Sequence, residues 1–282
     1  MRRPESTRAA AARWAIATPS PHDRLPGVDM AGFRDLSTDL VDLRVVPYPA
    51  VTVVVDFGDG VLVDDADGRQ RRGSVVLGLA PGGVRVSGRD IECLQVRLSP
   101  PVARAVLGDF PGPGSAALPL EDLWGRDAVR LRERLRDAAS WDDRFAIARA
   151  ALAPGRGAGP GVDPEVGHVW RRMVDSRGRL RVEPLATEVG WSRKRLWSRF
   201  GAQIGLTPKR AAQLVRFDHA AHLLAAGHSA SLVAVESGYA DQSHLHRDVM
   251  AFAGVTPTAV AAAPWLAVDD VAWAAPEHPA RR

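Results

Sequence analysis

The side chains that could perform catalysis or hold a metal ion are sparse in the first half of this sequence. No histidine lies between positions 22 and 168, so the commonest ligand of a first-row metal is missing there. One acidic cluster, Asp64, Asp65 and Asp67, precedes Gly68 and is more typical of a solvated turn than of a metal site. Neither a phosphate-binding loop nor a nucleophile elbow occurs. We therefore expect no enzyme activity, no catalytic residue, no metal and no cofactor.

The later histidines and the single cysteine favour structural roles. His219 and His222 are three residues apart but lack a third ligand, and His244 and His246 point in different directions on a helix. Cys93 cannot form a disulfide within the chain, which excludes a cysteine-ligated zinc site and indicates a reducing compartment. Its apolar neighbours predict a buried thiol rather than a redox sensor.

Composition predicts a cytoplasmic protein of about two domains with an uneven charge distribution. In the 282 residues no apolar run approaches the roughly 20 that a membrane span needs, and Arg13 interrupts the only stretch that could serve as a signal peptide. Residues 1–164 carry 22 basic and 22 acidic side chains, whereas residues 165–260 carry 13 basic and 8 acidic ones. The positive excess in the second half indicates either a surface for a polyanion or an ordinary solvated, arginine-rich face.

The elements expected before position 164 form a β-rich region followed by helices. Short apolar runs separated by Gly, Pro and Asp predict strands at 50–57, 60–63, 74–79, 84–87 and 91–98, in an antiparallel sheet, sandwich or small barrel. Leu131 and Leu135 recur at helical spacing, and Ser140 with Asp143 resembles a capping box that opens a second helix ending near Leu152. The Gly- and Pro-rich residues 153–164 are the best domain boundary.

The C-terminal third contains a weak internal duplication. The first copy has Ala186, Glu188, Gly190, Trp191, Leu196, Gly205, Thr207 and Pro208; the second has Ala234, Glu236, Gly238, Tyr239, Leu245, Gly254, Thr256 and Pro257. Each copy predicts a short helix, a glycine turn, an aromatic residue and a second helix capped by Ser192 or Asp241, which is the order of a helix-turn-helix. Residues 208–226 between the copies predict one long helix that Gly227 ends.

These residues resemble the AraC family of bacterial regulators over about 100 positions, 164–266. The segment from Gly238 to Arg247, followed by Gly254-Val255-Thr256-Pro257, is similar to the signature of that family nearly position for position. The N-terminal half resembles the variable sensor domains of such proteins, especially a subgroup with a β-rich module followed by Leu-Trp-Gly, here at 123–125. The resemblance implies an α+β fold: a β-rich sensor-like domain with two helices, then an all-α domain with two helix-turn-helix units joined by a long helix.

Helical geometry selects the side chains that would face DNA in the first unit. Leu196, Phe200 and Ile204 share one stripe and should pack inward, so the opposite face should enter the major groove as in the family. We assign base edges to Lys194, Trp197 and Ser198, and phosphates chiefly to Arg193, Arg195 and Arg199. The alternative for Trp197 is a surface aromatic ring that packs on a neighbour.

In the second unit Leu245 and Val249 should face inward, which leaves an outward face of Gln242, Ser243, His246 and Arg247. Gln242 and Arg247 have the hydrogen-bonding patterns that suit adenine and guanine edges. The family usually places Arg at position 198 and Lys or Arg at positions 201 and 250, where this chain has Ser, Gly and Met. Asp248 is expected to add a negative charge near this unit, so the second unit could either read bases or only hold the backbone.

The resemblance implies a transcription regulator, activator or repressor, that binds double-stranded DNA and has no membrane partner. A small-molecule effector, RNA polymerase and a second copy of the chain are the other partners that it implies. The expected division is a disordered segment at 1–27, a sensor or dimerisation domain at 28–153, a linker at 154–163, the DNA-binding domain at 164–266 and a disordered tail at 267–282. The alternatives are a DNA-binding domain fused to a DNA-repair or DNA-modifying enzyme, and an effector-independent DNA-binding protein whose first domain only dimerises.

Overall fold

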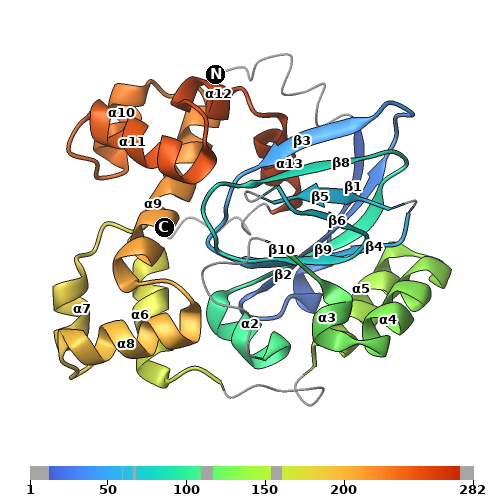
Figure 1. Ribbon diagram of the computed structural model, residues 1–282, viewed down its shortest axis with the longest axis horizontal. Helices are drawn as coiled ribbons and strands as arrows, with labels where there is room; N and C mark the ends of the chain where they lie inside the picture. Colours follow the sequence, from blue (N-terminus) through green and yellow to red (C-terminus); the bar gives the residue numbers. More distant parts are fainter. Residues whose placement is uncertain (1–12, 59, 66–67, 109–116, 154–160, 274–282) are drawn as a thin grey trace.

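The computed structural model describes residues 13–58, 60–65, 68–108, 117–153 and 161–273. Figure 1 shows an α+β molecule, in which two β-sheets with flanking helices are followed by a purely helical domain. This is the fold class that the sequence predicted. The strands are β1 (Trp14–Ala17), β2 (Val28–Asp35), β3 (Val41–Val45), β4 (Val51–Asp56), β5 (Leu62–Asp64), β6 (Gln70–Arg72), β7 (Val75–Leu77), β8 (Val84–Gly88), β9 (Glu92–Leu98) and β10 (Ala117–Pro119).

The two sheets are antiparallel and enclose an apolar interior. The first has the strand order β1-β2-β9-β4-β7-β10, and the second has the order β3-β8-β5-β6. In the centre of the first sheet Leu98 is opposite Val28 on one side and Val51 on the other. All six residues of β4 are buried, because one face of this sheet contacts the helices and the other faces the second sheet.

Helices cover the outer face of the first sheet. They are α2 (Pro100–Leu107), α3 (Leu120–Trp124), α4 (Arg126–Asp137) and α5 (Trp141–Leu152), with a 3₁₀ turn at Pro21–Asp23. The hydroxyl of Ser140 accepts a hydrogen bond from the amide of Asp143, so the predicted helix start is confirmed. The indole of Trp141 lies so close to Gly32 of β2 that a Cβ there would sit 2.0 Å from the ring, which explains a glycine inside a strand.

The C-terminal domain contains two helical units around one long helix. Its elements are α6 (Pro164–Asp175), α7 (Val182–Glu188), α8 (Arg193–Ile204), α9 (Pro208–Ala225), α10 (Ala230–Glu236), α11 (Gln242–Ala253), α12 (Pro257–Ala261) and α13 (Pro264–Ala272). Helix α9 corresponds to the predicted connecting helix, and Phe217 on it stacks on Phe252 of α11 with ring centroids 5.1 Å apart. Of the residues described, no helix is long and apolar enough to cross a membrane.

Two terminal segments differ from the expectation of disorder. Within 1–27, β1 forms and pairs with β2, Trp14 opposite Asp35; within 267–282, helix α13 continues to Ala272. Both are short segments that pack against another part of the chain, and the sequence alone does not show that contact. Residues 1–12, 154–160 and 274–282, which belong to the predicted N-terminal segment, linker and tail, lie outside the described residues, as does Asp67 of the predicted acidic turn.

The β-rich and helical domains share one apolar core and are not joined by a linker alone. Helix α2 packs against α6 and α8, and Arg104 of α2 donates to the carbonyl oxygen of Ala202 at 3.4 Å. The amide of Gly82, in the turn before β8, donates to the carbonyl oxygen of Phe252 at 3.0 Å. Both helical units therefore contact the β-rich domain, one through α8 and the other through α11.

Candidate DNA-binding interface

The two helical units have the same backbone hydrogen bonds at their turns. In the first, the amide of Trp191 donates to the carbonyl of Ala186 at 2.9 Å; in the second, the amide of Tyr239 donates to the carbonyl of Ala234 at 2.8 Å. The glycine before each aromatic residue, at positions 190 and 238, has a positive φ of 68° or 74°, which other residue types rarely adopt. The duplication in sequence therefore corresponds to a duplication in structure.

The second helix of each unit begins at a capping side chain, as predicted. The hydroxyl of Ser192 accepts from the amide of Arg195 at 3.2 Å, and a carboxylate oxygen of Asp241 accepts from the amide of His244 at 2.7 Å. These bonds satisfy amides that have no partner inside the helix and fix where α8 and α11 begin. Because the start of each helix is fixed, the face of the helix on which each later residue lies is fixed as well.

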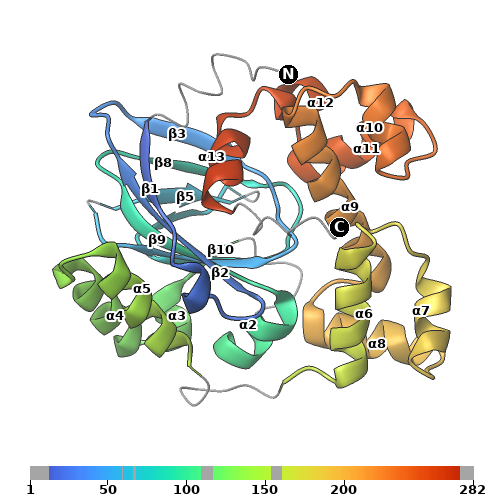
Figure 2. The same cartoon turned by 180° about the vertical axis from the view of Figure 1, so that it is seen from behind.

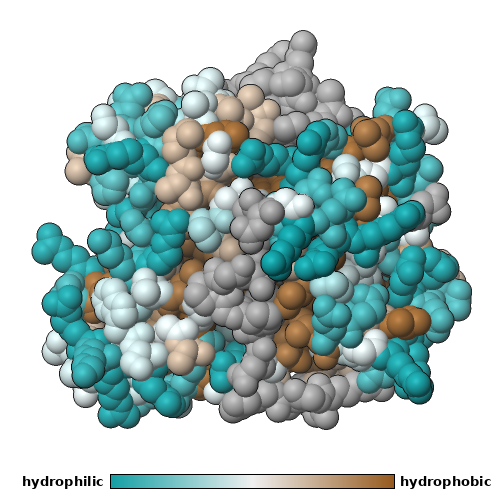
Figure 3. Space-filling view, in the orientation of Figure 1, coloured by the Kyte–Doolittle hydropathy of each residue, from teal (hydrophilic) through white to brown (hydrophobic). Residues whose placement is uncertain are grey.

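Helix α8 has the two faces that its periodicity predicted. Leu196, Phe200 and Ile204 are buried, whereas Lys194 and Ser198 are exposed. Trp197 is half-buried and packs against the edge of the core, so part of its ring is held by the protein and part is available. Arg193, Lys194, Trp197 and Ser198 together line an open concave surface. Figure 3 shows hydrophilic side chains along the lower-left edge of that view, over α7 and α8, interspersed with residues of intermediate hydropathy.

The three arginines assigned to phosphates have different surroundings. Arg193 is 3.4 Å from the carboxylate of Glu183, and the guanidinium of Arg195 lies 4.4 Å from the ring centroid of Trp191. Arg199 forms a two-pronged pair with Asp163 just before α6, with both N–O distances 2.7 Å. That pair raises the pKa of Arg199 and lowers that of Asp163 through their hydrogen bonds. Arg199 therefore already has an anionic partner, which the sequence did not predict.

Helix α11 exposes the four side chains that were assigned to its DNA-facing side. Gln242, Ser243, His246 and Arg247 are exposed, and Leu245 and Val249 are buried. Arg247 donates to the carbonyl oxygen of Ser243 at 3.4 Å, one turn earlier on the helix. Their roles toward DNA stay predictions.

Asp248, which was expected to add a negative charge near the second unit, lies on α11 but faces away from the DNA-facing side. Asp248 is only 7% exposed, on the inner face of α11, and its carboxylate lies 3.0 Å from the guanidinium of Arg216 on α9. Arg216 also lies over the ring of Tyr239, 4.4 Å from its centroid. Burial and the nearby Asp248 raise the pKa of Tyr239 well above its ordinary value. The sequence did not show this pairing because the cation lies 32 positions away, beyond what helical periodicity in α11 can reveal.

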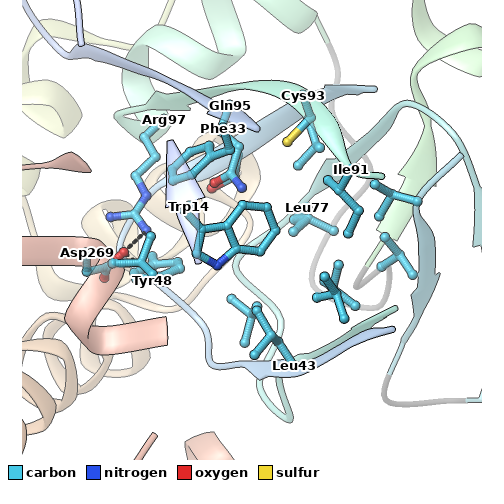
Figure 4. Close-up of a pocket in the computed structure, with 18 of the residues that line it drawn as sticks. Trp14, Phe33, Leu43, Tyr48, Leu77, Ile91, Cys93, Gln95, Arg97 and Asp269 are labelled. Atoms are coloured by element: carbon cyan, nitrogen blue, oxygen red, sulfur yellow. Dashed lines mark hydrogen bonds and ion pairs between the residues drawn. The ribbon is translucent and has the colours of Figure 1, made fainter. Parts of the chain in front are cut away.

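A second concave feature, the intersheet cavity, lies between the two sheets. It has a volume of about 100 Å³ and is lined mostly by Val, Leu, Ile, Phe and Trp side chains. Figure 4 shows Arg97, Tyr48 and Asp269 together at one end, with mostly apolar side chains around the rest, together with Gln95 and Cys93. Sequence reasoning missed these three polar residues, because Arg97 and Asp269 are 172 positions apart and no local motif links them.

Cys93 also lines the intersheet cavity and is buried, as predicted. Burial raises the pKa of its thiol to about 12, so the reactive thiolate is disfavoured at neutral pH. Within the described part of the chain, no three His, Cys, Asp or Glu side chains converge as a metal site would require. Nδ1 of His222 instead donates to the carbonyl oxygen of Asp218, 2.8 Å away.

Comparisons with known proteins agree with the repeated units. Residues 185–263 match a protein-family model described as a helix-turn-helix domain, which confirms the AraC-type resemblance for this segment. No curated protein matches the chain. Among solved structures, ToxT from Vibrio cholerae is 12% identical over 84% of this chain and 99% of that chain, with a TM-score of 0.48.

Two further solved structures match most of the chain. ToxT of Vibrio cholerae strain SCE256 with an unsaturated fatty acid bound is 10% identical, over 89% of this chain and 98% of that chain, with a TM-score of 0.46. The AraC-like transcriptional activator CuxR is 18% identical, over 71% of this chain and 85% of that chain, with a TM-score of 0.26.

Proposed function

We propose that this protein is a sequence-specific transcription regulator that places α8 and α11 in the major groove of double-stranded DNA. The observation that carries the proposal is the pair of helices that bury their apolar stripes and expose a polar face, each fixed by the same turn and cap. In this proposal Lys194, Trp197 and Ser198 contact base edges on the first site, with Arg193, Arg195 and Arg199 at phosphates. The DNA contacted by the second unit is bound in this proposal by four side chains of α11, Gln242, Ser243, His246 and Arg247.

The domain division in this proposal places DNA binding at 164–266 and control at 28–153. The intersheet cavity is the site for an effector, because it is a largely apolar cavity with a few polar groups at one end. RNA polymerase and a second copy of the chain are further proposed partners, and the site of action is the cytoplasm. A fused DNA-repair enzyme that uses a reactive thiol is disfavoured, since Cys93 is buried with a raised pKa.

Selection of bound sequences from random DNA with the full chain tests the proposal. Helix α9 has 18 residues and is therefore about 27 Å long, close to the roughly 34 Å of one turn of B-DNA. We expect two blocks of preferred bases about one helical turn apart, one for each unit. Recovery of no enriched sequence by a folded protein would contradict the proposal, and a single block would leave only one unit as a base reader.

Replacing Arg195 by alanine should weaken binding to all DNA sequences alike and lower the slope of log affinity against log salt by about one. Arg195 is exposed and stacks on Trp191, so its charge can reach a phosphate without breaking an ion pair with any residue that the structure describes. Arg199→Ala is the matched variant; it should change the slope less, because Arg199 already pairs with Asp163. The measurement is fluorescence anisotropy at several salt concentrations. A change of preference at one base pair with an unchanged slope would refute the phosphate role.

The isolated fragment 164–266 is expected to keep the sequence preference of the full chain, since both units and α9 lie within it. Circular dichroism establishes that the fragment folds, and anisotropy on the selected site and a scrambled site measures its preference. A folded fragment that binds both sites equally would show that contacts with the β-rich domain, such as that between Gly82 and Phe252, are needed to position the units.

A further inference from the structure

The last described helix, α13, leaves the second helical unit and returns to the β-rich domain. It packs against β1, β3 and α9, and Figure 2 shows it beside these strands. Val268, Asp269 and Trp273 line the intersheet cavity, and the ring of Trp273 is 6.3 Å from that of Phe33. The chain that follows the second unit therefore closes the cavity of the control domain.

An ion pair between the two domains fixes α13 in this position. The guanidinium of Arg97 on β9 lies 2.7 Å from a carboxylate oxygen of Asp269, and the hydroxyl of Tyr48 donates to the same oxygen at 3.1 Å. The guanidinium also lies between aromatic rings, 3.6 Å from the centroid of Tyr48 and 4.1 Å from that of Trp273. The side chains of Arg97 and Asp269 are only 12% and 5% exposed.

Because both charges are buried, neither can lose its partner without a large cost. Burial disfavours the carboxylate of Asp269, yet Arg97 and His222 together hold its pKa below the ordinary value. A molecule that takes the place of Asp269 must therefore bring its own negative charge to Arg97. A neutral apolar molecule would leave Arg97 buried and uncompensated.

The size of the cavity requires that α13 move when an effector binds. With α13 in place the volume is about 100 Å³, whereas sites for small molecules usually have about 300–1,000 Å³. An effector of ordinary size needs the space that Trp273 and Asp269 occupy. The effector can therefore enter only as α13 leaves the cavity.

We propose that Asp269 is an internal substitute for the anionic group of the effector, so that an apolar molecule with one carboxylate enters the intersheet cavity by displacing α13 from Arg97. This inference rests on the proposed control by an effector. It assigns the anion-binding residues, Arg97 and Tyr48, and the internal competitor, Asp269.

The same carboxylate connects the cavity to the helix between the two units. The second oxygen of Asp269 lies 3.5 Å from Nε2 of His222 on α9, whose Nδ1 is 3.7 Å from a carboxylate oxygen of Asp218. Burial lowers the pKa of His222, but these acidic partners outweigh it and raise the pKa to about 9. His222 is thus a cation at neutral pH. Displacement of Asp269 removes the contact that joins α9 to α13 and, through Arg97, to β9. Binding in the cavity then changes the contacts of α9, which packs against both α8 and α11.

The test measures binding of octanoate and of its neutral counterpart octan-1-ol to the full chain by calorimetry. Asp269→Asn keeps the size of the side chain and removes the competing charge, so octanoate should bind at least about tenfold more tightly than to wild type, with octanol little changed. The double variant Arg97→Met/Asp269→Asn is the matched control, and it should lose the preference for octanoate. Unchanged octanoate affinity in folded D269N, or binding of neither probe, would overturn the proposal.

A second measurement needs no variant. In wild type, saturating octanoate should accelerate hydrogen exchange of residues 264–273, and octanol should not; unchanged or slower exchange would overturn the displacement. Binding of the selected DNA site is measured on the same preparations. Intact specific DNA binding with a failed octanoate result rejects this inference alone, whereas loss of specific DNA binding by folded wild type rejects the proposed function.

Discussion

Replacing Arg216 by methionine is expected to lower the free energy of unfolding by about 3–5 kcal/mol and to disable the second DNA-facing helix. The substitution leaves the carboxylate of Asp248 buried without its cation, which was 3.0 Å away. It also removes the guanidinium that lies over Tyr239 at the turn before α11. Both losses act on the inner face of α11, so the outward face should lose its fixed position.

Urea denaturation monitored by circular dichroism measures this effect, with binding to the selected DNA site as a second readout. Asp248→Asn alone should also destabilise the protein, and the double variant Arg216→Met/Asp248→Asn should recover part of the loss, because no unpaired charge remains. Arg247→Met, at an exposed position on the same helix, is the control and should change stability by less than about 0.5 kcal/mol. Stability of Arg216→Met within about 1 kcal/mol of wild type would show that Asp248 is solvated or has another partner.

Replacing Arg247 by alanine is expected to flatten the preference at one base pair in the part of the site that α11 contacts. A two-pronged contact with guanine contributes about 1–3 kcal/mol of discrimination, or roughly 5- to 150-fold in affinity between bases. Arg247 is exposed on the outward face beside Ser243 and His246. Its neighbour Asp248 pairs with Arg216 inside the domain and so does not draw the guanidinium away from DNA.

Comparison of Arg247→Ala with Arg247→Lys on the selected site and its single-base variants separates base reading from backbone contact. Base reading requires that lysine restore the preference only in part, because an ammonium cannot reproduce the planar fork of a guanidinium. Uniform weakening by alanine with full rescue by lysine would instead make the second unit a phosphate clamp. Arg130→Ala, which removes an exposed charge from α4 of the β-rich domain, controls for the change in net charge.

Local signals in the sequence were sufficient to predict the two helical units. Gly190 and Gly238 permit the turn, Ser192 and Asp241 start the second helices, and the apolar spacing orients each helix, so the outward residues could be named in advance. Each signal acts within one or two helical turns, and such short-range rules hold in the fold because tertiary packing agrees with them. The five predicted strands near 50–98 correspond to β4, β5, β7, β8 and β9 for the same reason.

Only the tertiary structure decided which charges form pairs and where β1 and α13 pack. Asp248 and Arg216, Asp163 and Arg199, and Asp269 and Arg97 are separated by 32, 36 and 172 positions. The partner of a buried charge depends on how the domains dock, and no periodicity along one helix records that docking. Likewise β1 and α13 are too short to be stable alone; they form because β2 and the mouth of the intersheet cavity offer apolar surface and, for α13, a buried cation.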